Sequence, residues 1–263
     1  MSAKPPLSQH FLADAATVRK LLAAAEVAPG ETALDLGAGD GAIALPLTEA
    51  VGPRGACVAI ELDPRLAAAL RARAPPHLTV LEADALQAAL PAADVVVANP
   101  PFRIAAPLVL RLLDAPLDRA VLVLPEELAD RLTAKAGDAR YGRLTVQAQL
   151  RAGVVRCFGI PRRAFAPPPG VPCAAVRLDP HGLPDGLDAD VLEALLEAAF
   201  ASARRTLRHG LAPLAAKLRV PSGTITEALR ARGWEQRRPA ELAPRDYAAL
   251  AEGLMEAQAA AAR

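Results

Sequence analysis

Residues 34–41 read "LDLGAGDG" and decide the fold. Apolar residues open this stretch in the manner of a β-strand, and Gly37, Gly39 and Gly41 follow them at alternate positions. Glycines at such a place let the backbone turn tightly, and they let a ligand approach main-chain amides that a side chain would cover. The stretch therefore predicts a strand that ends in a ligand-binding turn.

Further strand-like segments alternate with segments of helical period such as 64–74 and 105–114. They are rich in Val, Leu and Ile without polar alternation, as expected for a parallel sheet buried on both faces. This alternation predicts an α/β fold with a Rossmann-like sheet, right-handed crossovers and a ligand crevice at the carboxyl ends of the strands. The expected strands are 32–37, 57–61, 78–83, 94–99 and 120–125.

The pattern changes from about residue 150 onward. Residues 154–160 ("VVRCFGI") and 174–180 ("AAVRLDP") are typical of a closing pair of strands around a proline-rich loop. Beyond "HGLPDGLD" the chain is almost wholly helical in period, with Gly and Pro at the turns. We therefore expect a sheet domain over 1–180, a linker over 181–188 and a small all-helical domain over 189–263.

The composition indicates a globular protein with one large core. The chain has 263 residues, of which 52% are hydrophobic, and it has no uninterrupted apolar stretch of about 18 or more residues. Its first residues, "MSAKPPLSQHFL", lack the pattern of a cleavable signal. We expect a cytoplasmic protein without a membrane partner.

The cysteines and histidines are too dispersed to predict a metal site. Three cysteines and four histidines lie far apart, without the spacing of metal ligands, although a Ser-His-Asp triad assembled in space stays open. We interpret the cysteines as inert core thiols in a reducing compartment. They are Cys57, Cys157 and Cys173.

Positive charge is concentrated in the second half of the chain. Residues 202–238 contain nine basic and two acidic residues, a local net charge of +7 in a chain whose total is +1. A second stretch, 151–177, has five arginines and no acidic residue. One such cluster alone is usually a solvated helix face, but two favour a polyanionic partner.

Acidic residues follow the strands next to the glycine turn. Glu61 stands 24 residues after Gly37, where a carboxylate can accept both hydroxyls of a ribose, and Asp84 follows the next strand. The glycines run G-x-G-x-G, not in the G-x-G-x-x-G order of NAD sites, and no phosphate-binding lysine follows. These features favour a nucleoside without phosphates, which Asp35 would not repel. S-adenosylmethionine fits, because its sulfonium and amino groups are cationic.

Residues 99–102 read "NPPF" at the end of the fourth expected strand. An aromatic amine is a poor nucleophile, so acceptors that hold its N–H bonds and turn its lone pair toward a methyl carbon would assist transfer. The Asn99 side-chain oxygen and the Pro100 carbonyl are candidates, with Phe102 stacked on the base. A turn amide and an ordinary core ring are the structural alternatives.

The sequence resembles the ribosomal RNA adenine dimethyltransferases of the KsgA type over nearly its whole length, and these are related to the erythromycin-resistance methyltransferases. The last three of the motifs that carry the resemblance are the most specific. In order the motifs are "SQHFLAD" (8–14), "LDLGAGDGAIALPL" (34–47), "AIELD" (59–63), "EADAL" (82–86), "NPPF" (99–102), "YGRLTVQAQ" (141–149), "AFAPPPGVPCAAVRL" (164–178) and "AFASARRTLRHGL" (199–211).

The resemblance implies roles for individual residues. Phe165 would be a second stacking ring opposite Phe102, so that a flipped-out adenine is sandwiched between them. "RRTLR", with Arg204, Arg205 and Arg208, would position RNA through its phosphates, although these arginines can also pair locally. The implied cofactor contacts are Gln9, His10, Leu12, Gly37, Gly39, Glu61, Asp84, Ala85 and Asn99.

Three positions depart from the family pattern. The family commonly has Asn-Leu-Pro-Tyr or Asn-Ile-Pro-Tyr at residues 99–102; the loss of the hydroxyl and the stiffer backbone can limit the site to one transfer. Asp-Ser is replaced by Pro172-Cys173, and His10 is often Asn in bacterial members.

The resemblance implies S-adenosylmethionine-dependent methylation of the 6-amino group of adenosine in small-subunit rRNA. Two adjacent adenosines near the 3′ end would each be methylated twice, by a monomer acting on a partly assembled subunit. The alternatives are a large-subunit rRNA methyltransferase of the erythromycin-resistance type, a DNA adenine or protein glutamine methyltransferase, and a non-catalytic assembly factor. A NAD oxidoreductase fits the motifs least.

Overall fold

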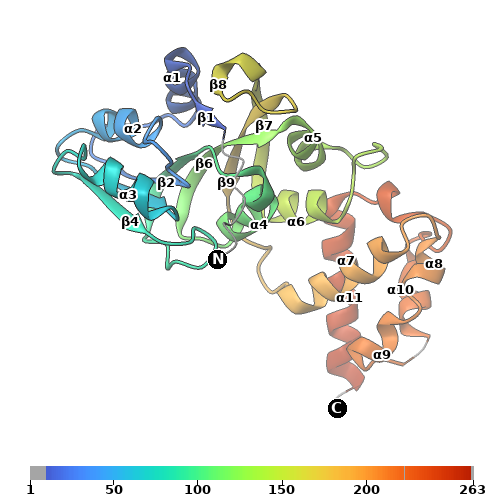
Figure 1. The fold of residues 1–263 in the computed structure, drawn as a ribbon. Coiled ribbons are helices and arrows are strands. Elements are labelled where there is room, and N and C mark those ends of the chain that lie inside the picture. Colours follow the sequence, from blue (N-terminus) through green and yellow to red (C-terminus); the bar gives the residue numbers. More distant parts are fainter. Residues whose placement is uncertain (1–9, 222, 262–263) are drawn as a thin grey trace, which may run out of the picture. The chain divides into compact units, whose positions relative to one another are not determined.

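The computed structural model describes residues 10–221 and 223–261 and divides into two compact units (Figure 1). The sheet unit comprises Met1–Ala129 and Gly153–Pro180. The helical unit comprises Asp130–Ala152 and His181–Arg263. Each unit has its own hydrophobic core.

The sheet unit is built on a seven-stranded sheet in the order β4-β3-β2-β5-β6-β9-β7. The strands β2 to β6 run parallel to one another, and β9 pairs with β6 in the antiparallel sense. The sequence-based prediction of five parallel strands and a closing pair is therefore confirmed. The strands are β2 (Thr32–Leu36), β3 (Ala56–Glu61), β4 (Leu78–Glu82), β5 (Ala93–Ala98), β6 (Leu117–Pro125), β7 (Ala152–Ile160) and β9 (Cys173–Pro180).

The strand order reverses direction at β2. From β2 the chain moves outward to β3 and β4, then returns to β5 on the other side of β2. Such a switch point leaves a crevice at the carboxyl ends of the two central strands, because the connections there run to opposite sides. The glycine turn follows β2 and "NPPF" follows β5, so both motifs meet at this crevice.

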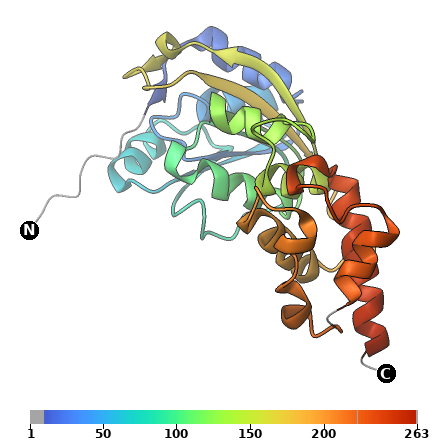
Figure 2. The same cartoon turned by 90° about the vertical axis from the view of Figure 1, so that its right-hand side faces the viewer.

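Helices and one short ribbon surround this sheet (Figure 2). Asp14 caps the first helix by accepting the backbone N–H groups of Ala16 and Thr17. The ribbon pairs β1 (Phe11–Leu12) with β8 (Phe165–Ala166) in the antiparallel sense. The helices are α1 (Ala15–Ala24), α2 (Ala44–Val51), α3 (Pro64–Arg71), α4 (Phe102–Leu113) and α5 (Glu126–Thr133), in which the boundary between the units falls.

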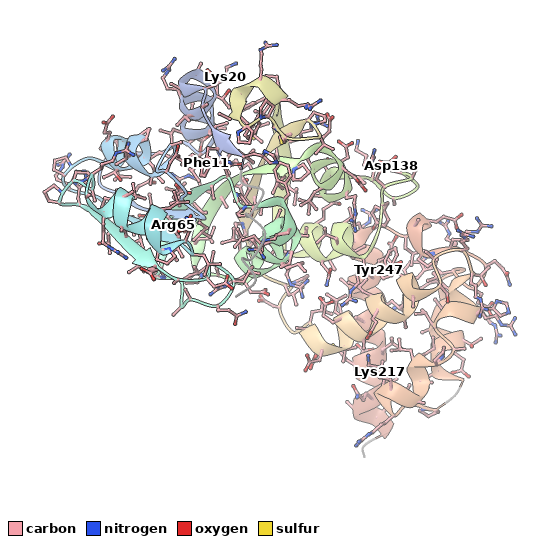
Figure 3. The ribbon with its side chains drawn as sticks, in the orientation of Figure 1. Phe11, Lys20, Arg65, Asp138, Lys217 and Tyr247 are labelled. Carbon is pink, nitrogen blue, oxygen red and sulfur yellow. The ribbon has the colours of Figure 1, made fainter. Side chains whose placement is uncertain are left out.

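The helical unit packs around the fully buried Tyr247, whose hydroxyl donates to the Pro239 carbonyl at 2.7 Å. Tyr141 is also buried and donates to the Leu242 carbonyl at 2.8 Å. Figure 3 shows Tyr247 on the long last helix of this unit. The helices are α6 (Arg143–Arg151), α7 (Ala189–Ala201), α8 (Leu207–Gly210), α9 (Leu214–Leu218), α10 (Thr224–Ala231) and α11 (Pro244–Ala261).

The division into units differs from the expected one at residues 130–152, which the sequence pattern had placed with the sheet. Arg151 donates a hydrogen bond to the Glu193 carboxylate at 3.0 Å, and Gln147 donates one to the same carboxylate at 2.6 Å. These two hydrogen bonds join α6 to α7. The expected linker 181–188 also belongs to the helical unit, because Leu187 is buried in its core and Asp188 caps α7. These long-range contacts leave no local sequence signal.

None of the helices in the described part of the chain is both long enough and apolar enough to span a membrane.

Candidate active site

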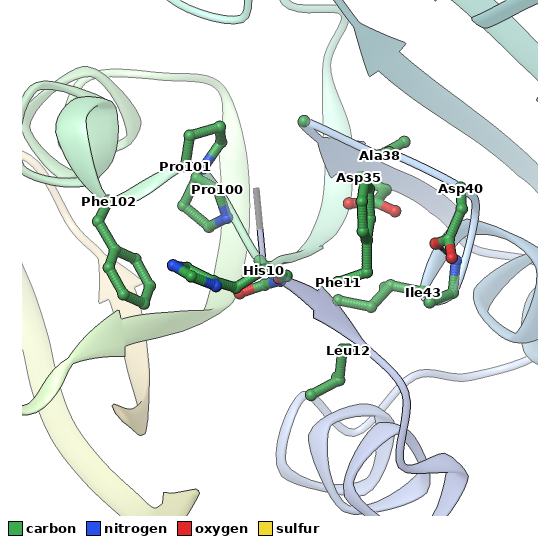
Figure 4. Close-up of a pocket in the computed structure, with 14 residues that line it drawn as sticks. His10, Phe11, Leu12, Asp35, Ala38, Asp40, Ile43, Pro100, Pro101 and Phe102 are labelled. Atoms are coloured by element: carbon green, nitrogen blue, oxygen red, sulfur yellow. Dashed lines mark hydrogen bonds between the residues drawn. The ribbon is translucent and has the colours of Figure 1, made fainter. Parts of the chain in front are cut away.

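Two adjoining hollows lie at the carboxyl ends of β2, β3 and β5, and they share Gly37 and Pro101 as lining residues. The first hollow (Figure 4) has an empty volume of about 520 Å³, and the second has about 570 Å³. The first is lined by residues that include His10, Phe11, Leu12, Asp35, Gly37, Gly39, Asn99, Pro100 and Phe102. The second is lined by residues that include Glu61, Asp84, Ala85, Pro101 and Arg103.

The glycine turn packs directly against its neighbours at two positions. Gly37 has φ +80°, and a Cβ added there would lie 3.2 Å from Cδ of Pro101. Gly39 has φ +56°, and a Cβ there would lie 2.8 Å from the ring of Phe11. Both positions therefore favour glycine for conformation, and Gly39 also favours it for space. The ring of Phe11 covers the turn, and sequence reasoning missed it although it stands between His10 and Leu12.

Asp35 points into the first hollow from the end of β2. Its side chain is only 2% exposed, and Oδ2 has no hydrogen-bond partner among the described residues. Burial, and after it the charge of Glu61, raises the pKa of Asp35 to about 8. A buried acidic group with an unused oxygen is costly unless a ligand satisfies it. From the sequence alone, Asp35 is predicted only not to repel a nucleoside ligand without phosphates.

The acidic residues of the second hollow are held by backbone hydrogen bonds. Glu61 is 3% exposed and accepts the N–H groups of Gly39 at 2.7 Å and Asp63 at 2.8 Å. Asp84 accepts the N–H of Leu86 at 2.9 Å. A carboxylate oxygen has a second lone pair, so each group still has acceptor capacity for a ligand. The structure thus brings together the two acids that the sequence singled out.

The loop after Asp84 is held in place by an arginine side chain of α4. The guanidinium of Arg111 donates to the carbonyls of Ala85 and Ala88. Because α4 begins at Phe102, the same helix carries the aromatic ring of the first hollow and holds the wall of the second. The expected helix began at 105; it begins three residues earlier because Pro101 serves as its N-cap and needs no hydrogen-bond partner for its nitrogen.

Asn99 has a defined orientation at the mouth of β5. Its Nδ2 group donates to the carbonyl of His10 at 2.9 Å, which turns Oδ1 away from that carbonyl and leaves it available as an acceptor. The ring of His10 lies beside that of Phe102, with 5.6 Å between centroids and an angle of 39° between planes (Figure 4). His10 Nδ1 lies 2.9 Å from the carbonyl oxygen of Pro167. The site therefore presents an amide oxygen beside an aromatic ring.

The chain is similar to known proteins over most of its length. Residues 1–229 match the family described as "Ribosomal RNA adenine dimethylase". The chain belongs to this family. It is 34% identical over 270 residues to "Ribosomal RNA small subunit methyltransferase A" of Parasynechococcus marenigrum (strain WH8102), a match that covers 96% of this chain and 87% of the relative.

Two solved structures share the fold of this dimethylase-family chain over most of its length. A dimethyladenosine transferase from Plasmodium falciparum superposes with a TM-score of 0.82 at 26% identity, covering 92% of this chain and 96% of the other. The 23S rRNA methyltransferase ErmE superposes with a TM-score of 0.69 at 28% identity, covering 93% and 99%. The predicted methyltransferase fold is thereby confirmed.

The structure places Phe165 of this member of the dimethylase family in the core, although the resemblance implies a stacking ring at the site. Its side chain is 3% exposed, packs in the core of the sheet unit and lines neither hollow. The β1–β8 ribbon pairs Phe165 with Leu12. Directly paired residues point to the same face, and Leu12 is itself buried. Phe102 is the ring that lines the first hollow, and Gln9 lies outside the described residues.

The second basic stretch is largely neutralised by acids from elsewhere in the chain. Arg156 pairs with Glu126, and Arg177 pairs with Asp179 at 2.9 Å and Glu26 at 3.1 Å. The absence of acids within a stretch of sequence therefore did not make it a positive patch. Arg163 differs, since it is exposed and has no acidic partner in the part of the chain that the structure describes.

The first basic cluster does form an exposed surface on the helical unit. The backbone N–H groups of Leu207 and Arg208 donate to the carbonyls of Arg237 and Glu235, which brings two segments together. Among residues 10–221 and 223–261, no carboxylate pairs with the exposed arginines of these segments. These are Arg204, Arg205, Arg208, Arg237 and Arg238.

The cysteines are free thiols without a catalytic environment. Burial raises the pKa of Cys57 to about 12 and that of Cys173 to about 11, so neither forms a thiolate near neutral pH. No group of three or more His, Cys, Asp or Glu side chains in the described residues could hold a metal ion.

Proposed function

We propose that this protein transfers methyl groups from S-adenosylmethionine to the 6-amino group of adenosine in small-subunit ribosomal RNA. Two adjacent adenosines, each methylated twice during subunit assembly, are the proposed targets. Family membership and the name of the relative support the RNA substrate. The observation that carries the chemistry is the fixed amide of Asn99, which keeps its oxygen available and lines the first hollow together with Phe102 and the glycine turn.

The residues of both hollows fit the proposed cofactor. Asp35 is a buried acid with an unused oxygen, suited to a cationic amino group, and Gly37 and Gly39 line the first hollow with backbone that no side chain covers. When bound, S-adenosylmethionine supplies an electrophilic methyl carbon on a sulfonium. In this proposal Glu61 binds the ribose, Asp84 and Ala85 bind the adenine of the cofactor, and the first hollow, with His10 and Leu12, binds the methionine end.

The chain prepares the target amine by accepting its protons. The Asn99 oxygen and the Pro100 carbonyl would hold the two N–H bonds and turn the nitrogen lone pair toward the methyl carbon. Phe102 would support the base by stacking. No strong general base is needed, because the nitrogen becomes acidic only as it is alkylated. Arg204, Arg205 and Arg208 would contact phosphates of the RNA, and the enzyme would act as a cytoplasmic monomer on a partly assembled subunit.

The pKa of Asp35 predicts that cofactor affinity depends on pH. Because this pKa is raised to about 8, the carboxyl group keeps its proton below that pH in the free protein. A bound ammonium group favours the carboxylate, so binding releases a proton and the affinity falls by up to about tenfold per pH unit as the pH drops below about 8. We expect the Kd, measured by calorimetry, to decrease with rising pH and to level off above about pH 8.

The variant Asp35→Asn provides the control for this prediction. It removes the titrating group, so any pH dependence that remains reports the cofactor's own groups. The unfolding free energy gives an independent readout: a raised pKa stabilises the fold fully below the unfolded value of 3.8, and this contribution is lost as the pH rises toward about 8. Identical Kd profiles for the wild type and Asp35→Asn would contradict the role of Asp35.

Methyl transfer from labelled S-adenosylmethionine tests the proposed function. Unmethylated small subunits, large subunits and duplex DNA are offered in parallel, and the modified nucleosides are identified by mass. We expect dimethyladenosine from small subunits alone. Label in large subunits would support the activity of the ErmE-like relatives instead. Monomethyladenosine would show that the "NPPF" sequence limits the reaction to one transfer, and cofactor binding without any transfer would indicate an assembly factor.

A further inference from the structure

A third hollow in the sheet unit lies between α1 and residues 158–164, outside the two hollows of the candidate active site. Its empty volume is about 840 Å³. We call it the α1 groove. Its lining includes Asp14, Thr17 and Lys20 from α1 and its cap, with Phe158, Arg163 and Ala164 on the opposite side.

The α1 groove is joined to the active site through the backbone. The N–H groups of Ala13 and Asp14 donate to the Ala164 carbonyl at 2.8 and 3.2 Å, which continues the pairing of β1 with β8. β1 also supplies Phe11 and Leu12 to the first hollow. Figures 1 and 2 both show α1 beside the segment that carries β8. The α1 groove thus adjoins the segment that supplies Phe11 and Leu12 to the first hollow.

The charged side chains that line the α1 groove have a net positive charge. Lys20, which is labelled on α1 in Figure 3, and Arg163 are both exposed, and neither pairs with a carboxylate among the described residues. Asp14 is the acid in the lining, and its oxygens are engaged by the N–H groups of Ala16 and Thr17 and by the Thr17 hydroxyl. That hydroxyl bond lowers the pKa of Asp14 and so favours its carboxylate form. The lining thus carries the two positive charges of Lys20 and Arg163 and the one negative charge of Asp14.

We infer that the α1 groove binds backbone phosphates of the RNA next to the target adenosine, through Lys20 and Arg163. The inference rests on the proposed function and adds a contact on the sheet unit to the arginines of the helical unit. Phosphate contacts fix the position of a nucleic acid without reading its sequence. A flipped base needs its flanking backbone held, because extrusion of the base has an energetic cost that such contacts offset. The groove therefore contributes to substrate affinity and not to the transfer step.

The test combines charge reversal with salt dependence. The variants Lys20→Glu, Arg163→Glu and their combination are assayed on unmethylated small subunits at several KCl concentrations. We expect the double variant to raise KM by at least about tenfold with kcat within about twofold. We also expect the slope of log KM against log salt to become shallower by about two, one for each lost phosphate contact. The Kd for S-adenosylmethionine should stay unchanged.

The matched control is Arg54→Glu. Arg54 is also exposed and has no acidic partner in the described residues, but it precedes the amino end of β3, whereas the candidate active site lies at the carboxyl ends of the strands, and it does not line the α1 groove. Its variant should keep the wild-type KM and salt slope. Lys20→Gln and Arg163→Gln, checked by thermal unfolding, replace the glutamates if charge reversal disturbs folding. In these neutral variants, KM and the salt slope should change in the same direction but by a smaller amount.

Two results would overturn the inference. An unchanged KM in the double variant would show that no RNA contact is made in the groove. A raised KM with the wild-type salt slope would assign the groove to a partner other than a polyanion, such as a ribosomal protein. In both cases the wild type still methylates the subunits, whereas failure of the proposed function would remove methylation from the wild type itself.

Discussion

Asn99→Ala is expected to lower the rate of methyl transfer by about a hundredfold to a thousandfold while changing cofactor Kd by less than about tenfold. The reason is the orientation of the amide, which donates to the His10 carbonyl and leaves its oxygen for the target amine. A preorganised acceptor at the reacting nitrogen acts mainly in the transition state, so its loss lowers kcat more than it weakens binding. Single-turnover rates with saturating subunits, together with calorimetric Kd values, measure both quantities.

The same variant also loses the hydrogen bond to His10, so a structural effect has to be separated from a chemical one. Thermal unfolding with and without cofactor shows whether the fold and the first hollow survive. His10→Ala is a suitable comparison, because it removes the ring beside Phe102 but keeps the backbone carbonyl that Asn99 needs. We expect it to reduce kcat far less. Equal losses of cofactor affinity and turnover in Asn99→Ala would reject the role of Asn99 as the acceptor for the base.

Phe165→Ala is expected to lower the free energy of unfolding by about 3–5 kcal/mol. Phe165 is 3% exposed, and its register partner Leu12 is buried in the same core. Truncation of a buried ring removes apolar contacts and leaves a cavity that the surroundings fill only in part. β8 pairs with β1, and β1 supplies Phe11 and Leu12 to the first hollow. We therefore also expect weaker cofactor binding there. Denaturant unfolding of the whole protein measures the change in stability.

Phe165→Leu distinguishes this core role from the stacking role that the family resemblance implies. Leucine keeps most of the buried volume, so it should cost only about 1 kcal/mol, and it cannot stack as an aromatic ring does. A stable Phe165→Leu protein with the wild-type turnover confirms that Phe165 acts through the core. A stable protein that binds cofactor but turns RNA over slowly would show that the ring reaches the adenine during the reaction.

The local sequence was sufficient to predict features that depend only on residues close together in the chain. The parallel strands were predicted within a few residues, because strands buried on both faces are uninterrupted apolar runs. Gly37 and Gly39 were identified because a turn with positive φ and no room for a Cβ accepts no other residue. Glu61, Asp84 and Asn99 were predicted as site residues because each lies at the end of a strand or just after it, and the carboxyl ends of parallel strands meet at the same side of the sheet.

The tertiary structure decided what depends on contacts between distant segments. Pairing of β1 with β8 placed Phe165 in the core and brought Phe11 over Gly39. Glu126 and Glu26, which are remote in sequence, pair with Arg156 and Arg177. The sequence by itself therefore determined the sheet, the glycine turn and the residues at the strand ends, since backbone conformation and strand polarity follow from local pattern. Which rings are exposed and which charges are free depends on long-range packing and pairing, and only the folded chain shows these.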